Sequence, residues 1–379
     1  MMKALFKKLF FVNVVLLSCN LLMAQVKIDN VPDAPGKLIR KNNTLQFINS
    51  FKVLSTAKAT SLAKTSDKIM DIICQSPHLN PPVGYNAKVH ISTSGSDLKD
   101  KMPTAEVVFY LRYLVKDSRY TGIRESMDGA DLYLNINDFD IFSQMGNYWK
   151  SCNELKFPLF FEEPVLTDST NNYIEFQYKG DPVRIVMAGS KPLFVPLTRK
   201  ELIQFVILRQ EQAVKSDNEA IKTSRTNEGT LKKLMVTWNE RDKAEAASSL
   251  KSMDNDIEQF QKNIKRSEKE IADCKSLLNT MSPQDAGAPA RLDYNKKSTA
   301  EGMASLERLV PVGRREGTLL VKLNPSFYNH SPNAPVAQMI VLYYAWPQVG
   351  FTQAPDFLQQ AILDIFNNMD YHQLKESMK

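Results

Sequence analysis

The chain has 379 residues, a length typical of two or three domains. Hydrophobic residues make up 43% of it, which is enough for a packed core and excludes a generally disordered chain. The formal net charge of +6 is too small for the electrostatic footprint of a nucleic-acid-binding protein, so no nucleic-acid partner is predicted.

The first 24 residues have the organisation of a secretory signal peptide. Three lysines precede a mostly apolar stretch at residues 9–17, and cleavage is expected after Ala24. We therefore expect export to the periplasm or the extracellular space. A second interpretation is a lipid anchor at Cys19, although Leu17 fits the lipoprotein processing motif poorly. No later segment is long and apolar enough to span a membrane.

Residues 25–43 read as a linker, and residues 44–198 as an N-terminal helix followed by a β-rich body. The helix is expected over Thr44–Cys74, where apolar residues recur at helical spacing. The pattern then becomes extended, with strand after strand and short turns, which favours an antiparallel sheet. The expected strands are Val89–Ser92, Ala105–Val115, Ala130–Asn137, Lys156–Phe161, the hairpin Tyr173–Ala188, and Leu193–Val195.

Residues 199–281 are expected to form a helical, coiled-coil arm. Thr198 and Glu201 have the spacing of a capping box at its start. The sequence Asn227-Glu228-Gly229-Thr230 predicts a reversal, followed by a second helix from Leu231 to Met281 of about 76 Å. An alternative places Gly229 inside one helix and the reversal near residues 254–256.

The second half of the arm carries a heptad repeat in which nine of ten a and d positions are apolar. Ser267 is the polar exception. Such a seam needs a partner helix. Because the predicted first helix is much shorter than the second, we expect part of the seam to be covered by the Thr44–Cys74 helix or by a second molecule. The predicted interaction seam consists of Leu250, Met253, Ile257, Phe260, Ile264, Ile271, Cys274, Leu278 and Met281.

Residues 282–379 are expected to complete the body with a loop, strands and a C-terminal helix. Thr318–Leu323 and Ala337–Trp346 read as strands, the second so continuously apolar that both its faces are predicted to be covered. A closing helix begins at Pro355. The fold class is therefore α+β, with a largely antiparallel sheet body, a long inserted helical arm and a C-terminal helix.

Motifs of common enzymes are missing from the sequence. It contains no His-Glu-x-x-His, Gly-x-Ser-x-Gly or phosphate-loop pattern, so we predict no metal and no cofactor. Ser55 and Ser61 each begin a Ser-x-x-Lys match, and Ser216-Asp217-Asn218 resembles a second serine acylase motif, but the late Lys-Thr-Gly is lacking. Scattered Ser, His and Asp leave a periplasmic or secreted hydrolase that acts on envelope polymer or peptide as an alternative interpretation.

A sugar- or ligand-binding module is the third interpretation. Tyr343, Tyr344, Trp346 and Phe351, or Tyr148 and Trp149, could form an aromatic platform, although aromatic residues in apolar strands are more often core.

Cys74 and Cys152 are the pair of cysteines that we would test for a disulfide.

Three stretches resemble exported proteins of unknown function of the kind found in the Bacteroidota: Met23–Gln25, Lys191–Glu201, and Leu320–Pro325 with Tyr328. The resemblance implies export and transfers no catalytic residue. The sequence thus favours an exported, non-enzymatic protein whose arm binds a protein partner or a second copy.

Overall fold

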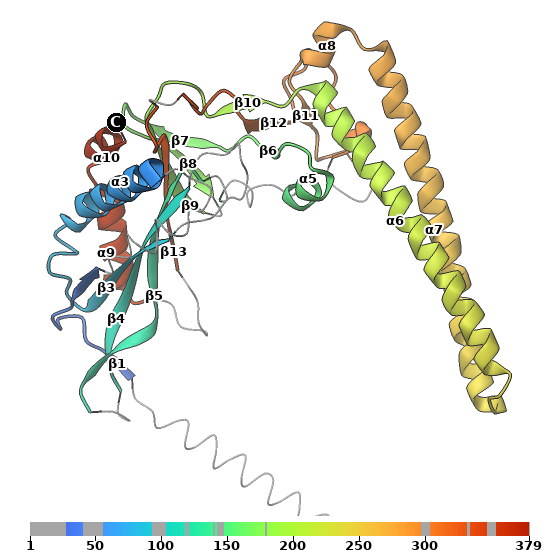
Figure 1. The fold of residues 1–379 in the computed structure, drawn as a ribbon, viewed down its shortest axis with the longest axis horizontal. Coiled ribbons are helices and arrows are strands. Elements are labelled where there is room, and N and C mark those ends of the chain that lie inside the picture. Colours follow the sequence, from blue (N-terminus) through green and yellow to red (C-terminus); the bar gives the residue numbers. More distant parts are fainter. Residues whose placement is uncertain are drawn as a thin grey trace, which may run out of the picture. The chain divides into compact units, whose positions relative to one another are not determined.

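The computed structural model describes residues 28–40, 56–92, 104–117, 121–138, 141, 148–178, 180–296, 304–331, 334–346 and 354–378. The predicted signal peptide, Cys19 and residues 44–55 of the predicted first helix lie outside these ranges. The helices and mostly antiparallel strands make the protein α+β, as predicted (Figure 1). The chain divides into two compact units: Met1–Phe139, Pro164–Ser190 and Tyr328–Lys379 form the first, and Asp140–Glu163 and Lys191–Phe327 form the second.

The first unit is built on a nine-stranded sheet. Its strand order is β2-β3-β4-β5-β13-β9-β8-β7, with β1 paired to β4, and only β2 and β3 are parallel. The strands are β1 (Ile28–Asn30), β2 (Leu38–Arg40), β3 (Tyr85–Ser92), β4 (Ala105–Asp117), β5 (Ile123–Ile136), β7 (Leu166–Ser169), β8 (Ile174–Tyr178), β9 (Asp181–Met187) and β13 (Met339–Ala345).

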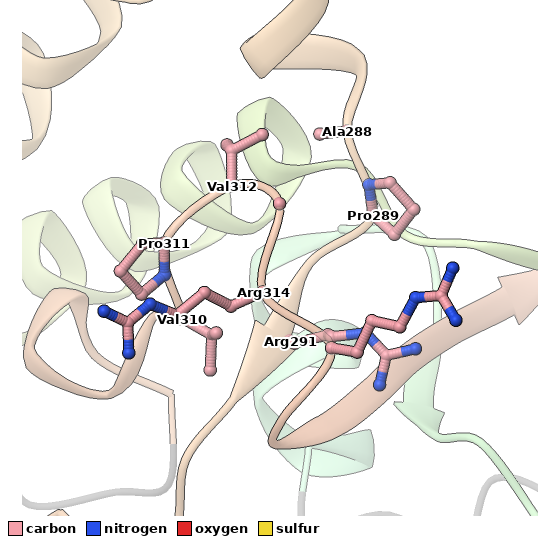
Figure 2. Close-up of a pocket in the computed structure, with 9 residues that line it drawn as sticks. Ala288, Pro289, Arg291, Val310, Pro311, Val312 and Arg314 are labelled. Atoms are coloured by element: carbon pink, nitrogen blue, oxygen red, sulfur yellow. The ribbon is translucent and has the colours of Figure 1, made fainter.

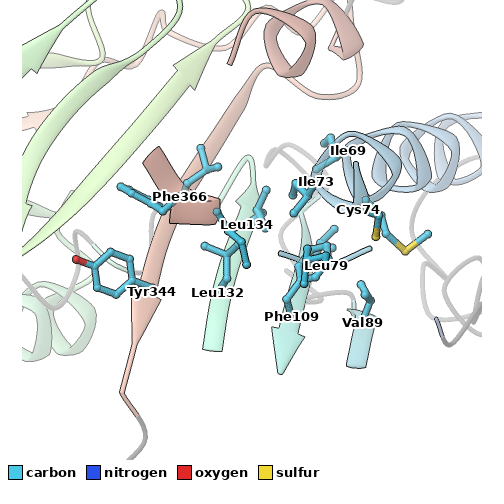
Figure 3. Close-up of a cluster of buried hydrophobic side chains, with 14 of the residues drawn as sticks. Ile69, Ile73, Cys74, Leu79, Val89, Phe109, Leu132, Leu134, Tyr344 and Phe366 are labelled. Atoms are coloured by element: carbon cyan, nitrogen blue, oxygen red, sulfur yellow. The ribbon is translucent and has the colours of Figure 1, made fainter. Parts of the chain in front are cut away.

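β13 is a central strand, as its apolar run predicts. It lies between β5 and β9, and each of Met339 to Leu342 is 0% exposed. Helices α3 (Thr56–Cys74), α9 (Asp356–Asn367) and α10 (Tyr371–Ser377) pack their apolar sides into the same hydrophobic cluster as this sheet. Figure 3 shows Ile69 and Ile73 of α3 above Phe109, and Phe366 of α9 beside Leu134. α3 therefore belongs to the core of the first unit.

A buried arginine ties the C-terminal helices to the sheet. Arg184 of β9 is 8% exposed, and its Nε lies 2.7 Å from Oε2 of Glu175. Its remaining nitrogens donate to the Phe366 carbonyl (2.8 Å), the Tyr371 hydroxyl (2.9 Å) and Oδ1 of Asn367 (2.9 Å). Because a buried guanidinium is tolerated only when it is paired and hydrogen-bonded, this network fixes where α9 ends and α10 begins.

The second unit contains a sheet of its own. β12 (Thr318–Leu323) pairs with β10 (Phe194–Pro196), β11 (Arg291–Leu292) and β6 (Phe160–Glu162), all antiparallel. α5 (Trp149–Leu155), α8 (Pro283–Gly287), the 3-10 helix η1 (Leu306–Arg308) and the two helices of the arm complete this unit. The sequence analysis assigned residues 44–198, which include β6 and β10, and residues 282–379 to one body that is separate from the arm. The structure instead groups these strands with the arm, because their partner β12 lies more than 120 residues further along the chain than β10.

Replacement of Arg184 by Met should destabilise the first unit. The change removes four interactions and leaves the Glu175 carboxylate, whose side chain is 14% exposed, without its cation. We expect the free energy of unfolding to fall by about 3–5 kcal/mol, measured by urea denaturation.

The matched control is Arg241→Met, because the Arg241 side chain is 87% exposed and its ion pair with Glu245 should contribute little. Equal effects of the two substitutions would contradict a structural role for the Arg184 network.

Candidate interaction site

The first arm helix, α6 (Arg199–Met235), begins at the predicted capping box. The Thr198 hydroxyl accepts from the Glu201 amide at 3.2 Å, and the Glu201 carboxylate accepts from the Thr198 amide at 3.0 Å. The first turns bury Leu202, Phe205 and Val206 in a cluster with Phe160 and Leu320. The arm is thus rooted in the small sheet of the second unit.

The reversal of the arm lies between the two predicted positions, and Gly229 lies inside the first helix, as the alternative prediction had it. α6 continues through Gly229 to Met235, and α7 runs from Glu240 to Thr280, with Asn239 as its N-cap. Gly229 does not end the helix because a single glycine costs only about 1 kcal/mol there. The Lys232–Glu228 ion pair and the hydrogen bond from the Thr230 hydroxyl to the Thr226 carbonyl (3.0 Å) support the helix on both sides of it.

The corrected reversal makes the two helices nearly equal, at 37 and 41 residues. α6 and α7 form an antiparallel hairpin, and each predicted seam residue on α7 is at least partly buried. The seam therefore packs on α6 of the same chain. The prediction that the second helix is much longer than the first is wrong, and α3, one of the two partners expected for the seam, belongs to the core of the first unit.

The half of the seam near the sheet is the better covered half. Cys274 is 0% exposed, and Ile271, Leu278 and Met281 pack against the cluster that contains Phe205. Arg209 and Glu270 add charges of opposite sign at this end. Burial raises the pKa of the Glu270 carboxyl, while the Arg209 charge opposes that rise.

Ser267, the one polar seam position, has a polar partner on α6. Its hydroxyl donates to Oε1 of Gln210 at 2.9 Å, and Nε2 of Gln210 donates to Oε2 of Glu270 at 2.5 Å. Gln210 and Ser267 are 7% and 5% exposed. A buried polar pair of this kind fixes the register of two helices, since a shift would leave both groups without partners. The sequence analysis missed Gln210, for which the isolated serine was the available signal.

The outer half of the seam is less well covered. Leu250, Met253, Ile257, Phe260 and Ile264 all remain partly exposed. Stepping outward from the Gln210–Ser267 pair by three and four residues in turn on each helix sets each of these residues level with a position on α6. The pairs are Val214 with Ile264, Asp217 with Phe260, Ile221 with Ile257, Ser224 with Met253, and Glu228 with Leu250. Three of these five positions on α6 are polar. We call the five outer seam residues the distal stripe.

The histidines and serines of the hydrolase interpretation are distributed over different elements. His78 follows α3 and lies 3.4 Å from Asp364, His90 lies on β3, and His330 and His372 are exposed. Ser61 is exposed on α3 in the first unit, whereas Ser216-Asp217-Asn218 lies on α6 in the second. Among the described residues, no group of three or more His, Cys, Asp or Glu side chains could hold a metal ion.

The aromatic residues proposed as a platform do not all share one surface. The rings of Tyr344 and the partly exposed Trp346 lie 5.4 Å apart, and Trp346 packs against the core of the first unit. Tyr344 is 7% exposed and its ring lies 5.3 Å from that of Phe366, so it is part of the core. Tyr343 is partly exposed and stacks on Tyr133 at 4.9 Å. Tyr148 is buried against Phe160, and burial raises its pKa to about 12. The Trp149 side chain and Phe351 lie outside the described residues.

The three cysteines of the described chain are free thiols. Cys74 belongs to the core of the first unit, and Cys152 and Cys274 belong to that of the second, so the Cys74–Cys152 pair is not formed. Burial raises the pKa of Cys152 to about 11 and that of Cys274 to about 12.

Comparison with protein-family models, curated proteins and solved structures finds no match to this chain. Within the described ranges, no helix has both the length and the apolar character needed to cross a bilayer.

Gln210→Ala should weaken the hairpin because it leaves the Ser267 hydroxyl buried without its partner and removes one hydrogen bond of the half-buried Glu270. We expect a loss of about 1–3 kcal/mol in the free energy of unfolding, followed by circular dichroism during urea denaturation. The double variant Gln210→Leu, Ser267→Ala should recover most of this loss, since it removes both polar groups together. A double variant as unstable as the single one would contradict the paired role.

The thiols should resist alkylation in the folded chain. A protein that begins at Gln25 and is treated with iodoacetamide at pH 8 should remain unmodified by mass spectrometry, because thiolate is the reactive form and these buried thiols stay protonated. All three should react after denaturation. Rapid labelling of Cys274 in the folded protein would contradict its position within the hairpin.

Proposed function

We propose that this protein is an exported, non-enzymatic binding protein, and that its helical arm associates with a second copy of the same arm. The observation that carries the proposal is the distal stripe, where five large apolar side chains face a mostly polar stretch of α6 and remain partly exposed. A third and a fourth helix packed on this stripe would remove that apolar surface from water.

A second copy is the partner to which the stripe is best suited. Two hairpins related by a two-fold axis bring the same residues of both copies together, so one apolar stripe covers the other. The stripe occupies residues 250–264, a length of about 22 Å. Such a contact is small, and we expect dissociation constants on the order of micromolar or weaker.

Export is supported by the N-terminal sequence alone, with its three lysines, its apolar stretch and the Ala24 cleavage site. Sequencing of the mature N-terminus should find Gln25 as the first residue. A mature chain that begins at Cys19 would favour a lipid anchor, and a retained Met1 would contradict export by this signal.

The arm contact is tested by light scattering during size-exclusion chromatography over a range of concentrations. The unaltered chain should pass from monomer to dimer as its concentration rises. Ile257→Asp should weaken the association by about tenfold or more, because a carboxylate cannot be buried between two stripes. The matched control is Gln261→Asp, which places the same charge on the exposed side of α7 and should leave the association unchanged.

A second measurement covers the case in which Ile257→Asp unfolds the arm. Ser252 is exposed on α7, so Ser252→Cys provides a site for donor and acceptor dyes in a chain whose own thiols are buried. A mixture of the two labelled preparations should show energy transfer that increases with concentration. A monomer at every concentration, with no energy transfer, would remove the proposed self-association.

A further inference from the structure

A hollow of about 280 Å³ lies in the second unit, beside the start of the arm. Its walls come from the segment Ala288–Arg291 and the loop Val310–Arg315 (Figure 2). Pro289, Val310 and Val312 supply apolar wall, and Arg291, Arg314 and Arg315 supply three guanidinium groups. A small apolar cavity with several converging polar groups is the usual form of a ligand site.

The positive charge around this hollow is only partly balanced. Arg314 lies 3.0 Å from the Glu316 carboxylate, and Nη1 of Arg291 donates to the Gly317 carbonyl at 3.0 Å. No hydrogen bond or ion pair of Arg315 is found in the described part of the chain. Two of the three guanidinium groups therefore have no carboxylate partner there, although like charges held together repel one another.

A fourth arginine holds both walls in place. Arg199, the first residue of α6, is 8% exposed. Its backbone amide donates to the Ala288 carbonyl at 2.9 Å, and its guanidinium Nη1 donates to the Val310 carbonyl. Its Nε is buried and has no hydrogen-bond partner. Burial lowers the pKa of Arg199, and the Asp285 charge acts in the opposite direction. Arg199 thus ties the two walls of the hollow together, and the lining itself carries one half-buried arginine, Arg291, and two exposed ones, Arg314 and Arg315.

We propose that this hollow binds the oxyanion group of a small ligand, with Arg291 and Arg315 as the principal contacts. A guanidinium offers two parallel N–H donors that match the oxygens of a carboxylate, phosphate or sulfate group. The volume admits such a group with a few attached carbon atoms against Pro289 and Val312. The hollow shares no residue with the distal stripe, so a failure of the proposed ligand binding would leave the proposed self-association unaffected.

Isothermal titration of the full chain tests the site, with inorganic phosphate, sulfate and benzoate as separate probes at constant ionic strength. Saturable binding of phosphate or sulfate would assign a phosphoryl or sulfuryl group, and saturable binding of benzoate alone would assign a carboxylate with an apolar body. Binding of none of the three would overturn the proposal.

Variants show whether any binding belongs to this hollow. Arg315→Gln should weaken it by about tenfold or more, and the fold should be unchanged because Arg315 is exposed. Glu316→Gln should strengthen binding, because it releases Arg314 from its carboxylate. The matched control is Arg241→Gln on α7, which removes the same charge elsewhere and should change nothing. A loss as large in the control as in Arg315→Gln, or no gain with Glu316→Gln, would also overturn the proposal.

Discussion

The packing of α7 on α6 is the interaction on which the second unit depends. The apolar seam of α7 cannot be left in water, and α6 runs beside its whole length because the reversal at residues 236–239 makes the two helices nearly equal. The inner end of α6 also contributes Phe205 and Val206 to the core above the small sheet. The same helix therefore closes the seam and anchors the arm.

The apolar residues of the hairpin are better buried near the sheet than at its outer end. Near the sheet, the Gln210–Ser267–Glu270 hydrogen bonds fix the register and the apolar neighbours are well buried. Further out, α6 presents Asp217, Ser224 and Glu228 to large apolar residues of α7. Buried polar pairs provide specificity more than stability. The inner half thus fixes the register of α7 against α6, and the outer half keeps exposed apolar surface that can contact another molecule.

The sequence predicted the features that depend on interactions between residues close together in the chain. The capping box at Thr198, the heptad on α7, the hairpin of β8 and β9 and the central position of β13 each follow from spacing or from a continuous apolar run. The α+β class follows from the order of these elements.

The features that the sequence did not predict depend on contacts between residues far apart in the chain. Gly229 reads equally as a helix stop or as a residue inside a helix, and the reversal lies at residues 236–239, which neither prediction named. Which strands share a sheet with β12 cannot be read from β6 or β10 alone. Tyr343 and Tyr344 look equivalent in the sequence, yet alternation along β13 places Tyr344 against Phe366 in the core and Tyr343 on the other face of the sheet. The arginine-lined hollow joins segments about 20 residues apart and has no sequence motif.

The most direct test of the account is amide hydrogen exchange over residues 250–264, measured at low and at high protein concentration. If the distal stripe is covered by a second copy, these amides should exchange more slowly as the concentration rises, while those of residues 271–281 stay unchanged. Exchange over residues 250–264 that is independent of concentration, in a chain whose hairpin remains folded, would contradict the account.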